Sequence, residues 1–428
     1  MKNNKFIVST LTLIFGGMFT KLLGFIIKII YTRIIGEDAI SLYMLVMPTY
    51  SLLITIASLA LPIAISKLVA EGKNSIKLAI NTGFIIIILN FFIILTMILT
   101  SDFIATTLLN EPRCKYLLIA CSLTLPFISI SSLIKGYFFG KQKVYPYAIS
   151  NVLEQVVRLT IISLVLPILI KMGIIHAVLG LILLSIISEI SSIIVFMFFM
   201  PKKFTINKKD LAPNKVYIKD ILNVSLPTVS SKIIGNVGFF FEPIILTNVL
   251  IYCGYSSVYV IREYGAYNAY SLGLLTMPGF FINALCQALV PEVSKYTTNK
   301  KMIKRRLFQS LSFAFLIGIT SSLGIFILRD WLLETVYNTN SGANYIKILA
   351  PFFVLFYLEA PLMSTLQAIG KSILTMKITT IGVIIKLVVL AILSLCHIGI
   401  YSLIYAEIIN IIVVVYLNFF YIKKYVFK

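Results

Sequence analysis

Charged residues are scarce in this chain, and acidic residues are the scarcer kind. Only 12% of the 428 residues are charged, with 16 Asp and Glu against 37 Lys and Arg, whereas 59% are aliphatic, aromatic or Cys residues. A soluble domain carries about a quarter charged residues. This composition therefore excludes an ordinary soluble protein and is typical of a chain whose solvent is lipid.

Residues that bind metals or act as nucleophiles are also few. The chain has two His and five Cys residues, and the Cys residues form no CxxC or CxxH spacing. Small apolar side chains in or near helices are the simpler interpretation of these Cys residues. No zinc, nucleophile or paired-carboxylate motif is visible, so we expect neither an enzyme nor a bound metal or cofactor.

Long apolar runs fill most of the remaining sequence. A helix needs about 20 apolar residues to cross the hydrocarbon of a bilayer, and continuous rather than alternating apolar sequence favours helices over a barrel. The first run is too long for a secretory signal, so we expect it to be retained. The sequence predicts an all-α polytopic membrane protein of about twelve transmembrane helices, at residues 6–30, 40–66, 78–100, 116–139, 146–170, 174–200, 221–250, 266–290, 307–328, 345–369, 373–395 and 399–422.

The net charge of +21 has a simple explanation in this topology. Most Lys and Arg residues fall at the N-terminus and in the even-numbered loops, and by the positive-inside rule those segments face the cytoplasm. We therefore expect a multi-pass protein of the bacterial cytoplasmic membrane with both termini cytoplasmic. Nucleic-acid binding is not needed to account for the charge.

The longest polar stretch divides the chain in two. Residues 201–220 hold six Lys against Asp210 and Asp220, which predicts a basic cytoplasmic linker between a six-helix lobe at 1–200 and a second at 221–428. An internal repeat supports this division, because Met47-Pro48 and Gly140-Lys141 recur at the same spacing as Met277-Pro278 and Gly370-Lys371. An even number of helices makes the two lobes a parallel repeat.

Several charges lie at membrane depth, where each costs about 2.5–3.5 kcal/mol and normally faces a bundle interior or an aqueous cavity. Snorkelling from a helix end is the alternative, and it can account for Lys28, Lys135, Glu242 and Glu407. It cannot account for the cations in the middle of their helices, which are Lys21, Arg158, Lys232 and Lys386.

The spacing of these residues predicts a shared face. Lys21 and Lys28 are two helical turns apart, and a polar stripe at helical spacing crosses the fifth helix through Asn151, Glu154, Gln155 and Arg158. A structural ion pair between Glu154 and Arg158 remains open. Because the repeat places cations at related positions in both halves, we expect one central cavity that selects anions. Prolines at 48, 62, 227, 278 and 291 predict bends in the helices around it.

Two segments resemble a known family. The runs Phe19-Thr20-Lys21-Leu22-Leu23-Gly24-Phe25 and Leu61-Pro62-Ile63-Ala64-Ile65-Ser66-Lys67 are similar to the stage V sporulation protein B and lipid II flippase branch of the MOP exporters. The resemblance implies two six-helix lobes with a cationic central cavity, alternating access, and a cavity cation at Lys21. The sequence departs from lipid II flippases at Leu52 and Leu53, where those have paired arginines, and we expect it to stop at twelve helices, without their two extra C-terminal helices.

Together these features favour a transporter that flips an undecaprenyl-pyrophosphate-linked saccharide outward. Its expected partners are that anionic lipid, membrane lipids and envelope-synthesis proteins. The predicted substrate-binding residues are Lys21, Lys28, Arg33, Asn151, Glu154, Gln155, Arg158, Lys232 and Lys386.

Two alternatives stay open. A cation-coupled exporter of drugs or metabolites would need a lone acidic coupling residue, for which Glu359 is the candidate. A membrane scaffold for envelope synthesis would transport nothing.

Overall fold

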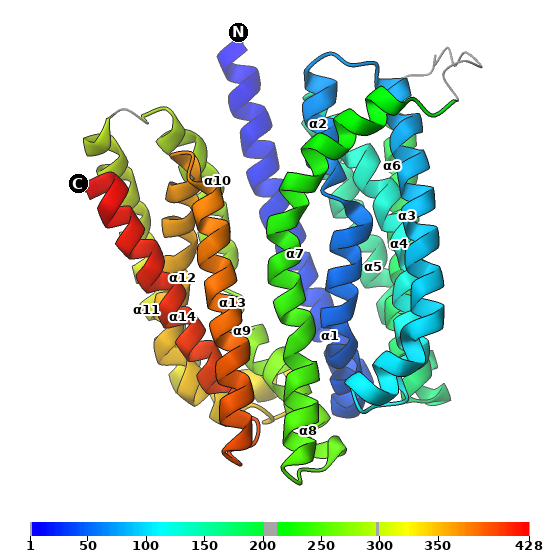
Figure 1. The fold of residues 1–428 in the computed structure, drawn as a ribbon, viewed down its shortest axis with the longest axis vertical. Helices are drawn as coiled ribbons and strands as arrows, with labels where there is room; N and C mark the ends of the chain where they lie inside the picture. The colour runs from blue at the N-terminus through cyan, green and yellow to red at the C-terminus, as the bar shows by residue number, and fades with distance from the viewer. Residues whose placement is uncertain (1, 201–211, 297–298, 428) are drawn as a thin grey trace. The chain divides into compact units, whose positions relative to one another are not determined.

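The computed structural model describes residues 2–200, 212–296 and 299–427, and every regular element in these ranges is helical (Figure 1). Helices satisfy their backbone hydrogen bonds internally, which lipid requires. The prediction of an all-α polytopic membrane protein is confirmed. Among the described residues, 10 helices are long and apolar enough to cross a membrane, or 11 if the bent pair Ser257–Thr276 and Gly279–Ser294 is one span. The total of about twelve stays a prediction.

The chain forms two compact units, Met1–Val237 and Gly238–Lys428. Their boundary lies within helix α7. The predicted division at the 201–220 linker stays a prediction, and residues 201–211 of it lie outside the described part of the chain. The first unit holds the beginning of α7 (Lys215–Tyr252) and the helices α1 (Lys2–Ser58), α2 (Leu61–Ala70), α3 (Ser75–Phe103) with the π turn η1 (Ile104–Leu108), α4 (Cys114–Gly140), α5 (Val144–Met172) and α6 (Ile174–Phe199).

The second unit holds the rest of α7 and the remaining helices. Its predicted span at 266–290 is divided into several short elements rather than one helix. The elements are α8 (Ser257–Gly265), η3 (Ala266–Ser271), α9 (Leu272–Thr276), α10 (Gly279–Ser294), α11 (Lys300–Tyr337), α12 (Ala343–Ala368), α13 (Ser372–Leu395), α14 (Tyr401–Ile422) and η4 (Lys423–Phe427).

Helix α1 contains two of the predicted spans and reverses between them. Its backbone leaves the helical region at Gly36, where φ is 76°, a conformation that glycine adopts without steric cost. The ring centroids of Tyr31 and Tyr43 lie 5.7 Å apart, and Lys28 and Tyr50 line the same cavity, so the chain doubles back there. The first of the two helices continues through Arg33 to the break at Gly36.

Helix breaks occur at only one proline of each repeated pair. Leu59 and Ala60 adopt left-handed conformations, with φ of 44° and 50°, and Pro62 lies in the first turn of α2. In the second unit the 54° bend falls between Thr276 and Gly279, at Pro278. Proline cannot donate the helical hydrogen bond, yet Pro48 and Pro291 stay inside their helices. The bends therefore differ between the two copies of the repeat.

Glycines allow the closest helix contact of the first unit. A Cβ atom added at Gly136 would lie 2.9 Å from Pro62 Cα, and one added at Gly140 would lie 2.7 Å from the carbonyl oxygen of Ser66. Small residues four apart let two membrane helices approach to backbone contact. Helix α4 therefore packs directly against α2.

The beginning of α7 belongs to the first unit. Ile221 and Val229 join a buried cluster with Leu61, Leu68 and Leu78 of α2 and α3, and Asp220 forms an ion pair with Lys73. Helix α5 packs against α1 and α6. The polar stripe of α5, which includes Glu154 and Arg158, therefore lies inside the first unit.

We expect Gly140→Ala to lower the free energy of unfolding, because its new methyl group meets backbone atoms that cannot rotate away. Overpacking of this kind costs about 1–3 kcal/mol, which thermal unfolding in detergent will detect as a lower midpoint. Gly83→Ala in α3 is the matched control, since nothing lies within 4 Å of its new Cβ. Equal effects of the two substitutions would contradict the close α2–α4 contact.

Candidate functional site

A polar cavity of about 460 Å³ lies inside the first unit, among α1, α4, α5 and α6. This volume is within the range of small-molecule sites. Charged side chains at membrane depth normally face such a cavity. Its charged, amide and hydroxyl-bearing lining residues are Lys28, Tyr31, Tyr43, Tyr50, Glu154, Gln155, Arg158, Ser185 and Glu189.

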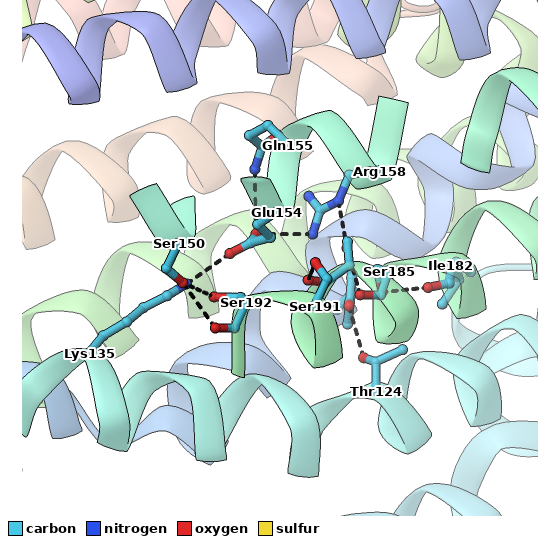
Figure 2. A network of polar contacts seen from close by, with 12 residues as sticks. Thr124, Lys135, Ser150, Glu154, Gln155, Arg158, Ile182, Ser185, Ser191 and Ser192 are labelled. Atoms are coloured by element: carbon cyan, nitrogen blue, oxygen red, sulfur yellow. Dashed lines mark hydrogen bonds and ion pairs between the residues drawn. The ribbon is translucent and has the colours of Figure 1, made fainter. Parts of the chain in front are cut away.

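Glu154 is the centre of a buried ion-pair network (Figure 2). Its Oε2 accepts a hydrogen bond from Lys135 Nζ at 2.9 Å, and its Oε1 accepts from Arg158 Nη2 at 3.4 Å. The side chains of Lys135, Glu154 and Arg158 are 18%, 8% and 28% exposed. The carboxylate thus pairs with Arg158, which resolves the alternative that the sequence left open, and it also pairs with a second cation.

The helical register of α5 builds this network. Glu154 and Arg158 are four residues apart, so they share one face. From there the Arg158 Nε donates to Ser188 Oγ on α6 at 3.1 Å. The hydroxyls of Ser150 and Ser192 form a hydrogen bond of 2.6 Å between the same two helices. These contacts hold α5 and α6 together and fix the direction of the guanidinium.

Two charged groups in the cavity have unused bonding capacity. Lys28 of α1 lines the cavity and forms no hydrogen bond or ion pair with the described residues. Glu189 of α6 also lines it, and its Oε2 atom is buried without a hydrogen-bond partner among those residues. Buried polar groups without partners cost free energy, so this cavity is built to hold water or a polar ligand.

Only some of the predicted site residues line this cavity. Lys28, Glu154, Gln155 and Arg158 line the cavity. The other predicted residues of the first unit are outside its described lining: Lys21, Arg33 and Lys232 are exposed, and Asn151 is half-buried.

Lys386 lies in the second unit, where its Nζ pairs with Glu242 Oε2 at 2.5 Å and with Glu407 Oε2 at 2.6 Å. It is therefore neutralised by two carboxylates, and snorkelling does not describe Glu242 or Glu407. The single cavity expected between the two halves stays a prediction.

Glu359 of α12 lines a separate cavity of about 260 Å³ in the second unit, together with Thr276, Asn283 and Tyr357. Its carboxylate forms no hydrogen bond or ion pair with the described residues. The proposed role of Glu359 in coupling stays a prediction.

Lys135 and Glu189 were missed as site residues. Lys135 lies only five residues before the end of α4, so a snorkelling side chain was an adequate explanation of it. Glu189 was visible as an acidic residue at membrane depth, but no partner spacing on α6 marked it. A search for every buried charge, whatever its distance from a helix end, would have found both.

The described residues contain no group of three or more His, Cys, Asp or Glu residues placed to hold a metal ion. The charged, amide and hydroxyl groups that line the first-unit cavity can recognise a ligand by electrostatic attraction and hydrogen bonding.

Comparison with known proteins identifies the family. The polysaccharide biosynthesis protein family matches residues 7–297, and the MatE family matches residues 243–392. Stage V sporulation protein B of Bacillus subtilis (strain 168) is 35% identical over 399 residues, which cover 90% of this chain and 77% of that protein.

Two solved structures share the fold. An inward-facing multidrug resistance MATE family transporter of the MOP superfamily has a TM-score of 0.74 at 15% identity, covering 94% of this chain and 93% of that one. The lipid II flippase MurJ in an inward closed conformation has a TM-score of 0.69 at 15% identity, covering 96% and 87%. These findings confirm the resemblance carried by residues 19–25 and 61–67. The chain belongs to the polysaccharide biosynthesis protein family, in the stage V sporulation protein B and lipid II flippase branch of the MOP superfamily.

Proposed function

We propose that this protein flips a lipid-linked saccharide, joined to its lipid through a pyrophosphate, from the inner to the outer leaflet of the cytoplasmic membrane. The observation that carries the proposal is Lys28, which lines a polar cavity at membrane depth and has no hydrogen-bond or ion-pair partner among the described residues. An unpaired ammonium in such a place is costly, and a bound phosphate would offset that cost through charge-assisted hydrogen bonds.

The charge balance of the site supports an anionic ligand. Lys28, Lys135 and Arg158 supply three cations, whereas Glu154 and Glu189 supply two carboxylates. If all five groups are ionised, the net charge of the site is +1, and Glu154 holds two of the three cations. A cationic drug would meet repulsion there, so the anionic lipid headgroup is the better fit.

The remaining polar groups suit a saccharide. Tyr31, Tyr43 and Tyr50 combine apolar rings with hydroxyl groups, and Gln155 adds an amide to the same lining. Tyr50 is held by a hydrogen bond of 2.8 Å with Thr124. A cavity of about 460 Å³ has room for a pyrophosphate and a neighbouring sugar, while the lipid tail would stay in the bilayer.

The proposed transport cycle is alternating access, in a protein whose two termini both face the cytoplasm. Both termini face the cytoplasm, as the distribution of Lys and Arg predicts. The breaks at Leu59–Ala60 and between Thr276 and Gly279 supply the bends needed for opening and closing. Lys21 would lie on the same helix face as Lys28, two turns away, along the route of the phosphate.

A second candidate function is a cation-coupled exporter of drugs or metabolites. Glu359 favours it, because its carboxylate lines a cavity and has no hydrogen-bond or ion-pair partner in the described part of the chain. Such a carboxylate can bind a proton or a cationic group.

Lys28→Gln should reduce flipping of a labelled lipid-pyrophosphate saccharide in reconstituted vesicles by at least roughly tenfold, because one lost charge-assisted hydrogen bond is worth about 1.5–3 kcal/mol. Lys28→Arg should retain most of the activity, since it keeps the charge. Lys171→Gln, which removes an exposed cation at the end of α5, is the matched control. Full activity of the Lys28→Gln protein would refute the cavity as the binding site.

Glu154→Gln should destabilise the protein by roughly 3 kcal/mol, because it leaves two cations without compensation in a buried place. Thermal unfolding of Glu154→Gln, Lys135→Met and the double variant gives the coupling between the two residues. We expect the double variant to be more stable than Glu154→Gln alone. Strictly additive effects would show that the Lys135–Glu154 pair does not contribute to stability.

Glu359→Gln distinguishes the two candidate functions. If the protein is a cation-coupled drug exporter, this substitution alone abolishes export of a cationic dye from vesicles. If it is a lipid-saccharide flippase, wild-type protein exports no dye, and the substitution leaves affinity for the lipid headgroup unchanged.

A further inference from the structure

An apolar groove of about 560 Å³ lies on the second unit between α11 and α14. Helix α12 packs against both of them and forms the floor of the groove (Figure 1). The aromatic residues along its two walls are between 49% and 72% exposed: Phe308, Phe315, Tyr416 and Phe419. Exposed apolar side chains are ordinary where a helix faces lipid. A concave site of this volume is not, since ligand sites are clefts of about 300–1,000 Å³.

The groove has the length of a large part of one lipid leaflet. Each of the three helices lines it over two turns, at residues 308–315, 355–362 and 412–419, which is about 10 Å along a helix axis. One leaflet contributes about 15 Å of hydrocarbon, half of the bilayer core. An acyl chain that enters from the membrane surface would therefore lie in the groove for most of its length.

One end of the groove lies where α11 begins and α14 ends. Ile303 and Leu307 of α11 join a buried cluster with Val426 of η4. The Nζ atom of Lys304 lies 4.8 Å from the ring centroid of Phe427, which is a cation–π contact. These contacts place the basic segment at the start of α11 beside the basic end of α14, at one side of the membrane. We name this side the basic end of the groove.

Two cations at the basic end continue the walls of the groove. Arg305 lies three residues before Phe308, and Lys423 lies four residues after Phe419. At these spacings each cation shares a helix face with its wall residue. Both side chains are exposed, and neither forms a hydrogen bond, an ion pair or a ring contact with the described residues. The two walls thus end in free cations.

The carboxylate that joins the ion pairs at the basic end is already occupied. Glu292 of α10 pairs with Lys295 at 3.3 Å and with Arg306 at 3.0 Å. The segments 300–309 and 416–428 contain no Asp or Glu. In the described part of the chain, Arg305 and Lys423 are therefore left without a carboxylate, and an anion from outside the protein can supply the negative charge.

We infer that the groove binds an anionic phospholipid, with one acyl chain between α11 and α14 and the phosphodiester at Arg305 and Lys423. A guanidinium can donate two parallel hydrogen bonds to a phosphate, and an ammonium adds a third. The aromatic walls gain dispersion contacts with the chain. A zwitterionic phospholipid would bring its own cation to the basic end, so the site selects a lipid of net negative charge.

The charge of the basic end argues against a second copy of this chain in the groove. A twofold dimer brings the same surface patch of each subunit together. Arg305 and Lys423 of the two copies would then approach each other, and like charges repel. An anionic lipid meets attraction at the same place.

The inference does not rest on the proposed function, and its test involves no flipping. Delipidated protein in detergent is titrated with palmitoyl-oleoyl phosphatidylglycerol and, separately, with palmitoyl-oleoyl phosphatidylcholine, which has the same chains and a zwitterionic headgroup. Native mass spectrometry measures the fraction of protein that carries lipid. We expect the wild type to bind the phosphatidylglycerol at least about tenfold more tightly, as charge-assisted hydrogen bonds imply.

Charge variants test the basic end. Arg305→Gln and Lys423→Gln should each reduce the preference for phosphatidylglycerol, and together they should abolish it. Lys377→Gln is the matched control and should keep the preference, because Lys377 is exposed and lies five residues into α13, as Arg305 lies five residues into α11.

A second pair of variants tests the groove itself. Ser312→Trp places a large ring in the groove and should weaken binding of both lipids. Thr320→Trp, at an exposed position farther along α11 and outside the described lining, should change neither. Size-exclusion chromatography and thermal unfolding identify variants that fail to fold, and one folded variant of each pair is sufficient for the conclusion.

Four results would overturn the inference. The first is equal binding of the two lipids by the wild type, and the second is a preference that survives the double charge variant. The third is thermal stabilisation by glycerol 3-phosphate as large as that by phosphatidylglycerol, which would reduce the site to a surface phosphate site without a role for the groove. The fourth is a wild-type dimer that Ser312→Trp dissociates, which would make the groove a subunit interface.

Discussion

A charge inside a membrane must be matched by an opposite charge, by water or by a ligand, and this constraint organises both units of the protein. Each unmatched charge costs about 2.5–3.5 kcal/mol even on insertion scales. Glu154 meets the constraint with two cations, and Lys386 meets it with two carboxylates. Lys28 and Glu189 line one cavity, where Lys28 has no ion-pair partner among the described residues, which is why we propose that cavity as the substrate site.

The two units share an internal repeat, but their buried charged residues form different ion pairs. Arg158 on α5 and Lys386 on α13 are both cations in the middle of a helix, yet Arg158 shares its carboxylate with Lys135 whereas Lys386 pairs with two carboxylates. Although both are cations, the carboxylates around Arg158 and around Lys386 are therefore different in number. The ion-paired groups thus carry a positive excess in the first unit and a negative excess in the second.

Glycine and proline decide where these helices can approach and bend. Gly136 and Gly140 bring α4 against α2, and Gly382 brings α13 against α14. The left-handed backbone at Leu59 and Ala60 and the bend before Gly279 interrupt helices at places that are not equivalent in the repeat. A transporter built this way bends differently in its two units.

The sequence by itself determined the membrane class, the helical fold, the family and the stripe of α5, because continuous apolar runs and helical spacing are local properties. It also identified nearly every buried charge. Only the tertiary structure decided which charges meet, since Lys135 reaches Glu154 across 19 residues of sequence and Lys386 reaches Glu242 across 144. Spacing along one helix carries no information on those pairings, which depend on how separate helices pack. Cations that were expected to act alike therefore proved different: Arg158 and Lys386 are ion-paired, whereas Lys28 has no ion-pair partner among the described residues.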